Sequence, residues 1–324
     1  MATNFQQFAM AGDDFSYKLG PPNSGFSLFL ADRTKKIHFI RHAEGAHNVA
    51  THTTGTNDCL LREANTPGSK HPLYDARLTQ VGIDQSKSLK KHLSCRPSGG
   101  RSFTAFDLVV TSPLTRTLET TSHIFGRPRT PGVPAFLDEG ASHGEKVPAP
   151  RVLVREECRE RWGKYVCDGR RPIREICKEF PGFDFSELEH DEDVFYLEDE
   201  REPDEECCAR AVAFLEWLNR RPEKCIAVVT HSSFLRHLFG QFGGSLASDD
   251  QDSLQRLAGN CELRSVVLCS HGNKDSKQPD KMKANFPTLV KKQSFGKSKL
   301  RNPSTVVMSS GVEGEFEGDC ENTE

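Results

Sequence analysis

Three short, largely apolar runs dominate the hydrophobic pattern of this chain. They cover residues 37–40, 108–111 and 227–230, and their β-branched content predicts buried strands of a parallel sheet. Apolar residues also recur at helical spacing over residues 205–220 and at Phe234, Leu235, Leu238 and Phe239. This alternation of strands and amphipathic helices predicts an α/β fold, a three-layer sandwich with a mainly parallel sheet flanked by helices.

Residues that suit catalysis follow each of these runs. Arg41 and His42 follow the first, Ser112 and Arg116 the second, and His231 the third. Because side chains at the carboxyl ends of parallel strands face the ligand crevice, we expect these residues to meet. A neutral imidazole attacks phosphorus through one ring nitrogen when a hydrogen bond fixes the other, and a guanidinium binds phosphoryl oxygens. The pattern therefore favours phosphoryl transfer.

Several residues near these strand ends have two interpretations. Asn48 either caps the helix after the first strand or donates its amide to a phosphate, and Ser112 has the same ambiguity. Pro113 suits the first position of the next helix, and Thr79 suits a helix N-cap. His47 has no HxH or CxxC partner nearby, which favours a supporting or exposed position over a metal ligand.

Four motifs occur in a fixed order between residues 35 and 270. They read RHAEGAHN from Arg41, DARLTQVGIDQ from Asp75, SPLTRTLETT from Ser112, and VVTHSSFLR from Val228. Together they resemble the histidine phosphatase superfamily, or phosphoglycerate mutase-like proteins, with Glu119 where that family usually has glutamine. The resemblance is strongest to the plant phosphoglycerate mutase-like proteins, and it implies the same three-layer fold.

The resemblance also implies roles for individual residues. His42 would be the nucleophile that becomes phosphorylated, and Arg41, Arg116 and His231 would complete the phosphate pocket. These cationic partners would stabilise the charge of the transition state, so no metal and no cofactor is expected. The residues expected to contact the substrate are Asn48, Ser112 and Ser232.

A general acid must protonate the departing oxygen, and the family places it after another strand. The segment VLVREECRERWG, residues 152–163, offers Glu156, Glu157 and Glu160. The spacing to Gly163 favours Glu160, with Glu156 next. A general acid at this position needs a raised pKa in the pocket.

The expected activity is phosphomonoester hydrolysis, with two alternatives. His231 is followed by Ser232 and Ser233, where glycolytic mutases resemble HGN, so mutase-type transfer ranks second. A pocket that binds a phosphorylated ligand without turnover is the non-enzymatic alternative.

A cysteine-dependent mechanism is a weaker rival. Residues 95–101, CRPSGGR, have the C-x5-R spacing of cysteine phosphatases. That loop should follow a buried strand, whereas SKSLKKHLS before it has the pattern of a solvated helix. We therefore interpret it as a turn.

The composition of the chain bears on its expected partners and on its expected cellular compartment. The formal net charge of -3 over 324 residues does not suggest nucleic acid or an anionic membrane as a partner. The expected partner is therefore a small phosphorylated substrate of the predicted pocket. Eleven irregularly spaced cysteines indicate reduced thiols, and no transmembrane or signal segment is evident, so a cytoplasmic location is expected. The sequence does not specify an oligomeric state.

Three segments are expected along the chain. Residues 1–34 should be poorly ordered, residues 35–271 should form the histidine phosphatase domain, and residues 272–324, rich in Lys, Ser and Gly, should be a disordered tail. Within the domain, residues 178–206 are strongly acidic. They are either a solvated connection or a lid that repels polyanions.

Overall fold

The structure, a computed structural model, describes residues 30–94, 106–126, 150–242 and 247–270. All of these lie in the first of the chain's two units, residues 1–284. The predicted tail and most of the predicted N-terminal segment therefore lie outside the described residues, and so does the CRPSGGR loop.

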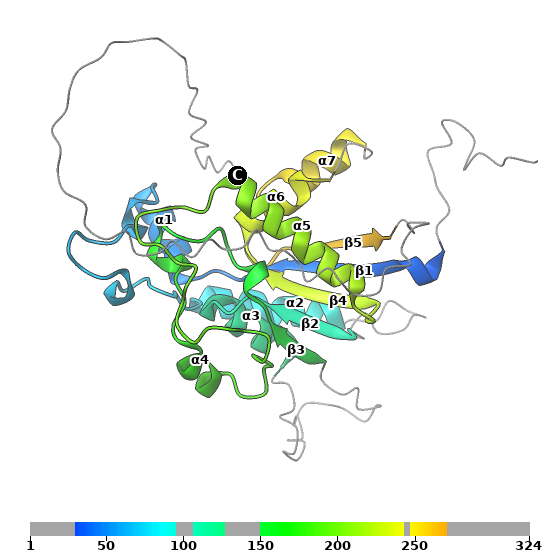
Figure 1. The fold of residues 1–324 in the computed structure, drawn as a ribbon, viewed down its shortest axis with the longest axis horizontal. Coiled ribbons are helices and arrows are strands. Elements are labelled where there is room, and N and C mark those ends of the chain that lie inside the picture. Colours follow the sequence, from blue (N-terminus) through cyan, green and yellow to red (C-terminus); the bar gives the residue numbers. More distant parts are fainter. Residues whose placement is uncertain (1–29, 95–105, 127–149, 243–246, 271–324) are drawn as a thin grey trace, which may run out of the picture. The chain divides into compact units, whose positions relative to one another are not determined.

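A five-stranded mixed sheet lies at the centre of the described residues (Figure 1). Its order is β3-β2-β4-β1-β5, in which β1 to β4 run parallel and β5 runs antiparallel to β1. The strands are β1 (Thr34–Arg41), β2 (Leu108–Thr111), β3 (Arg151–Val154), β4 (Cys225–Thr230) and β5 (Leu263–Cys269). The mainly parallel sheet confirms the predicted fold class.

The α-helices of the described residues are α1 (Ala46–Thr54), α2 (Gln80–Ser94), α3 (Thr115–Phe125), α4 (Ile173–Glu179), α5 (Asp204–Arg220), α6 (Ser232–Gly240) and α7 (Ser248–Gln255). Short 3-10 helices cover Ala31–Arg33, Asp58–Leu60, Gly68–Lys70, Glu156–Cys158 and Val166–Asp168. Helices α5 and α6 lie over one face of the sheet, and α2 and α3 lie over the other (Figure 1).

The period of the strands explains the two helix layers. Successive side chains of a strand point to opposite faces. Ile226 and Val228 of β4 pack in the core beneath α5 and α6, whereas Ala227 and Val229 pack in the core with α2 and α3. A strand buried on both faces reads as a continuous apolar run, which is why the sequence pattern located β4 correctly.

The start of α3 differs from its prediction. Pro113 is not the first helical residue, because α3 begins at Thr115. Leu114 before it is extended, with φ −69° and ψ 135°. The helix starts there because the Asp75 carboxylate accepts hydrogen bonds from the Thr115 backbone N–H (2.7 Å) and hydroxyl (2.6 Å). A residue forty positions away therefore supplies the cap, and Arg116 becomes the second residue of the helix.

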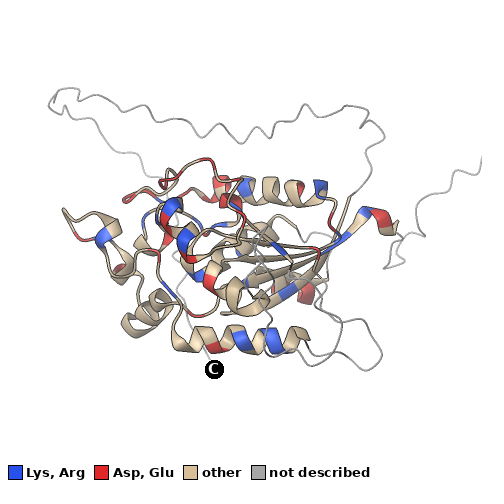
Figure 2. Cartoon of the chain, turned by 90° about the horizontal axis from the view of Figure 1, so that it is seen from below, with Lys and Arg blue, Asp and Glu red and all other residues tan. Residues whose placement is uncertain are grey.

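Two other observations bear on the alternatives. Helix α2 extends to Ser94, so the C-x5-R segment follows a helix and not a buried strand. Among the described residues, no helix is both long and apolar enough to span a membrane. Basic and acidic residues are interspersed along the described part of the chain (Figure 2).

Candidate active site

The ends of three adjacent strands bring the predicted residues together. Strand β4 lies between β1 and β2, and His42, Ser112 and His231 each follow the last residue of one of these strands. Backbone bonds extend the pairing past the strands, because His42 N–H donates to Thr230 (2.9 Å) and Ser112 N–H donates to Val229 (3.2 Å). The expected meeting of these strand ends is therefore confirmed.

His42 is buried, and a hydrogen bond fixes its tautomer. Its Nδ1 lies 2.8 Å from the carbonyl oxygen of Ala43. A carbonyl only accepts hydrogen bonds, so Nδ1 carries the proton and Nε2 keeps its lone pair. Burial, with Arg116 and Arg41 nearby, holds the pKa of His42 well below the ordinary value of 6.5. The ring is therefore neutral at physiological pH, the form that a nucleophile requires.

The ring of His231 lies beside that of His42, with 5.2 Å between the ring centroids. Its Nε2 lies 2.9 Å from the hydroxyl of Ser112, and both residues are fully buried. Its Nδ1 is buried and has no hydrogen-bond partner among the described residues. Burial, followed by the nearby charge of Arg116, keeps the pKa of His231 well below 6.5. Ser112 thus orients His231 through the other ring nitrogen.

A second imidazole lies near His42 and was not a predicted site residue. His47 of α1 has its ring centroid 5.3 Å from that of His42 and is only 7% exposed. Burial, with Arg116 and Arg41, lowers its pKa well below 6.5. The RHAEGAHN motif contains His47, but the sequence did not show that the first turn of α1 faces His42.

Arg116 is 1% exposed and influences the pKa of all three histidines. Its Nη1 donates to the carbonyl oxygen of Cys167, and its Nη2 pairs with Asp168 at 3.1 Å. Its Nε is buried without a partner in the described part of the chain. We call His42, His47, Arg116 and His231 the imidazole cluster.

The loop after His42 is held by the motif that begins at Asp75. The Glu44 N–H donates to Gln85 Oε1 (2.9 Å), and the Thr79 hydroxyl donates to Glu44 Oε1 (2.6 Å). Thr79 also accepts from Gly82 N–H, which confirms it as the N-cap of α2. A Cβ at Gly82 would lie 2.1 Å from the Glu44 carbonyl oxygen, so a glycine is needed there.

Three predicted site residues lie beside the cluster. Arg41 ends β1, and its Nη1 donates to the carbonyl oxygen of Ala258 (2.7 Å). The Asn48 Oδ1 accepts from Gly45 N–H (3.0 Å), so the capping interpretation of Asn48 is confirmed. Ser232 is the first residue of α6, directly after His231.

The candidate acids occupy different surroundings. Glu160 is buried, and its carboxylate accepts backbone N–H bonds from Phe234 (2.8 Å) and Ser233 (3.3 Å) in the first turn of α6, which follows His231. Glu156 instead bonds to Arg170 (2.7 Å) and Arg159 (3.0 Å). Glu156 is therefore engaged by two guanidinium groups, whereas Glu160 is held at the helix that follows His231.

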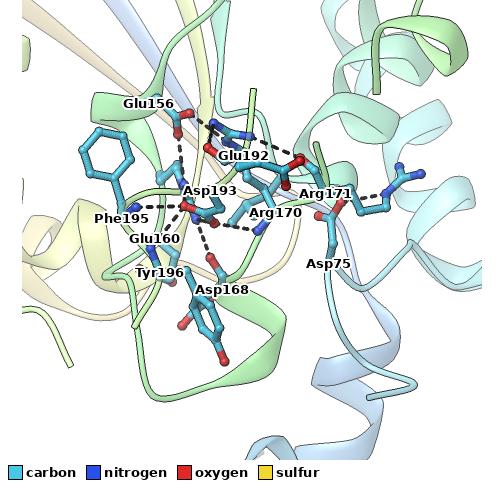
Figure 3. A network of polar contacts seen from close by, with 12 residues as sticks. Asp75, Glu156, Glu160, Asp168, Arg170, Arg171, Glu192, Asp193, Phe195 and Tyr196 are labelled. Carbon is cyan, nitrogen blue, oxygen red and sulfur yellow. Dashed lines mark hydrogen bonds and ion pairs between the residues drawn. The ribbon is translucent and has the colours of Figure 1, made fainter. Parts of the chain in front are cut away.

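The acidic segment is neither a solvated connection nor a separate lid along its whole length. The side chain of Asp193 is 5% exposed and pairs with Arg159. It also accepts a hydrogen bond from the Arg170 backbone N–H (Figure 3). Glu156 bonds to both arginines. We call Glu156, Arg159, Arg170 and Asp193 the arginine–carboxylate network. Arg159 and Glu156 are three residues apart, but Asp193 is 34 residues from Arg159, so local charge patterns did not predict the network.

Other surface features lie apart from the imidazole cluster. A groove along α2, lined in part by Val81, Leu89 and Cys261, includes no member of the cluster. Among the described residues, no group of His, Cys, Asp and Glu side chains has an arrangement that suits a metal ion. The cysteines described are all free thiols.

Comparisons with known proteins agree with the motifs. A phosphoglycerate mutase-like protein of Arabidopsis thaliana is 36% identical over 259 residues, which cover 78% of this chain and 90% of the relative. Phosphoglycerate mutase-like protein 1 of the same plant is 36% identical, over 76% of this chain and 85% of the relative. The chain belongs to the phosphoglycerate mutase-like proteins. It is therefore an enzyme of the histidine phosphatase superfamily, and the predicted resemblance is confirmed.

Other comparisons are more distant. No protein-family model matches the sequence. The alpha-ribazole phosphatase of Shigella flexneri aligns with a TM-score of 0.39 and 16% identity, over 71% of this chain and 89% of that one. A mycobacterial glucosyl-3-phosphoglycerate phosphatase aligns with a TM-score of 0.39 and 16% identity, over 72% and 91% of the two chains.

Proposed function

We propose that this phosphoglycerate mutase-like protein hydrolyses small phosphomonoesters through a phosphohistidine on His42. One observation carries the proposal. A neutral imidazole with its Nδ1 proton held by Ala43 lies among buried nitrogens of Arg116 and His231 that have no partner within the described residues. A buried unpaired donor costs roughly 1–3 kcal/mol, and an anionic ligand would remove that cost.

The reaction has two steps. In the first, the His42 Nε2 lone pair attacks phosphorus in line, the P–O bond to the alcohol breaks, and the departing alkoxide takes a proton from Glu160. In the second, the Glu160 carboxylate accepts a proton from water, whose oxygen attacks phosphorus. The P–N bond breaks, phosphate leaves, and His42 is again neutral.

The surrounding residues would divide the remaining tasks. Arg41, Arg116 and His231 would contact the phosphoryl oxygens and stabilise the charge of the transition state. Ser112 would position His231 through their hydrogen bond. Asn48 caps α1 with its Oδ1 only, so its amide N–H groups would contact the substrate together with the hydroxyl of Ser232. Glu160 is preferred to Glu156 as the acid because Glu156 is paired with two arginines.

The test uses the purified full chain and p-nitrophenyl phosphate. We expect phosphate release by the natural sequence and a loss of roughly 10⁴-fold or more in His42→Ala, since removal of a nucleophile disables the whole mechanism. A brief reaction with radiolabelled substrate should leave an acid-labile, base-stable label on the protein, and His42→Ala should carry none. Turnover that survives in His42→Ala contradicts the proposal.

The same preparation separates the two alternatives. The relatives are named phosphoglycerate mutase-like, so phosphoglycerate isomers are a suitable second substrate. Movement of phosphate between the hydroxyl groups without release would indicate a mutase. Binding of inorganic phosphate with neither reaction would indicate a binding protein without turnover.

A further inference from the structure

His47 lies as close to His42 as His231 does. Its ring centroid is 5.3 Å from that of His42, and the corresponding distance for His231 is 5.2 Å. His42 therefore has two other imidazoles at nearly the same distance. His231 follows β4, whereas His47 is the second residue of α1, so the two rings come from separate parts of the chain.

The backbone beside His47 allows this close approach. A Cβ at Gly45 would lie 2.8 Å from His47 Nδ1 and 2.9 Å from its Cε1. The imidazole thus packs directly against the main chain that leaves His42. The fit holds the ring in place, because no larger residue at position 45 leaves room for it.

Packing alone does not account for an imidazole here. His47 is 7% exposed, and its Nδ1 is buried without a hydrogen-bond partner among the described residues. Buried ring nitrogens in folded proteins nearly always have a partner. An apolar ring would fill the same space without the cost of burying a polar nitrogen.

The charges around His47 indicate what kind of ligand would suit it. Burial, followed by the charges of Arg116 and Arg41, lowers its pKa, and its buried Nδ1 has no carboxylate or other hydrogen-bond partner within the described residues. A neutral imidazole retains one N–H donor. The ring therefore offers a donor in positively charged surroundings, which an anion can accept.

We propose that His47 is a catalytic residue whose ring N–H contacts the phosphoryl group while the group is transferred to and from His42. This inference rests on the proposed function, because it concerns the same site. It adds a third imidazole to the phosphate pocket, beside those of His42 and His231. The contact also makes inorganic phosphate, the product, a ligand of His47.

The test compares variants of His47 in the full chain. His47→Phe and His47→Leu remove the ring N–H in different shapes, and His47→Gln retains an amide donor. His52→Ala is the control, because His52 is an exposed residue of the same helix. The measurements are kcat and KM for p-nitrophenyl phosphate, and the inhibition constant of inorganic phosphate.

We expect His47→Phe and His47→Leu to lower kcat/KM by about 10²-fold, as for loss of one donor to a developing charge. The inhibition constant of phosphate should rise in both, His47→Gln should recover part of the loss, and His52→Ala should match the natural sequence. A folded His47→Phe or His47→Leu protein that keeps both constants within about twofold overturns the inference.

The outcomes also distinguish the two proposals. If His42→Ala is inactive and unlabelled while His47→Phe or His47→Leu behaves like the natural sequence, only the role of His47 is lost. If the natural sequence binds phosphate but forms no phosphoenzyme, the proposed function fails. A weaker phosphate affinity in the His47 variants then still supports the contact.

Discussion

Two buried polar clusters of this protein differ in how their charged and polar groups are paired. In the arginine–carboxylate network, Arg159 pairs with Glu156 and Asp193, and Arg170 pairs with Glu156. In the imidazole cluster, no carboxylate within the described residues hydrogen-bonds to an imidazole, and Arg116 has Asp168 as its carboxylate partner. The network is built from opposite charges that satisfy one another, whereas the cluster concentrates donors.

The difference indicates what each cluster does. Paired buried charges lose much when one partner is removed, because the other is left uncompensated. Buried donors without partners lower stability and are retained where a ligand uses them. We therefore expect substitutions in the network to affect folding first, and substitutions in the imidazole cluster to affect chemistry first.

The largest expected effect is on stability, from Asp193→Asn. Asp193 is the carboxylate that pairs with Arg159 through both of its oxygens. Its neutral replacement should lower the free energy of unfolding by about 3–5 kcal/mol. Urea unfolding followed by circular dichroism measures this loss.

Glu192→Gln is the matched control for Asp193→Asn. Glu192 is the neighbouring acid, but its side chain is 66% exposed and pairs with the exposed Arg174. Its replacement should change the free energy of unfolding by no more than about 1 kcal/mol. Equal losses in the two variants would mean that burial of the network contributes nothing.

The second prediction concerns Arg116→Met, where the loss should fall on activity. Arg116 would contribute about 2–4 kcal/mol of transition-state stabilisation, as one donor to a developing charge. The free energy of unfolding should change less than in Asp193→Asn, because Arg201 still pairs with Asp168. Measurements of kcat/KM and of urea unfolding on the same samples test the contrast. A variant with an unchanged kcat/KM and a loss of unfolding free energy as large as in Asp193→Asn would contradict it.

The sequence predicted most of the imidazole cluster but not the arginine–carboxylate network. His42, Arg116 and His231 could be located because each follows a buried strand, and parallel neighbours align their carboxyl ends. The apolar face of α6 was also correct, since Phe234, Leu235, Leu238 and Phe239 are all buried. Local periodicity determines both of these features.

Contacts between distant segments were beyond the sequence pattern. Asp75 determines the start of α3, and Asp193 pairs with Arg159, yet neither partner is near the other in the chain. His47 was predicted to be a supporting or exposed residue, because its neighbours suggested no metal-ligand set. Its importance depends on the direction in which the first turn of α1 faces, and that direction is fixed by packing against Gly45.

A smaller effect is expected from Gly82→Ala, which tests how the site is supported. The added Cβ would lie 2.1 Å from the Glu44 carbonyl oxygen, two residues after His42. Relief of that clash should cost about 1–3 kcal/mol of stability. It should also shift the loop that holds His42, so kcat/KM should fall as well. Gly240→Ala is the control, since a Cβ at that glycine meets nothing within 4 Å.

The smallest expected effect concerns the pH dependence of stability, which should differ between the two clusters. The pKa values of His42, His47 and His231 are held well below 6.5, first by burial. The unfolded chain therefore binds protons near pH 6.5 that the folded chain does not, so stability falls as the pH drops below that value. The pKa of Asp193 is lowered from 3.8 by Arg159 although burial opposes this, so the network loses stability only in stronger acid.

Each buried histidine should contribute a slope of up to about 1.4 kcal/mol per pH unit below its unfolded pKa. Urea unfolding between roughly pH 7.5 and 5.5 should show a shallower slope in His47→Gln than in the natural sequence. An identical slope in His47→Gln would mean that His47 takes up its proton as readily in the folded protein as in the unfolded chain. The prediction that the imidazole cluster loses stability at a higher pH than the arginine–carboxylate network would then fail for His47.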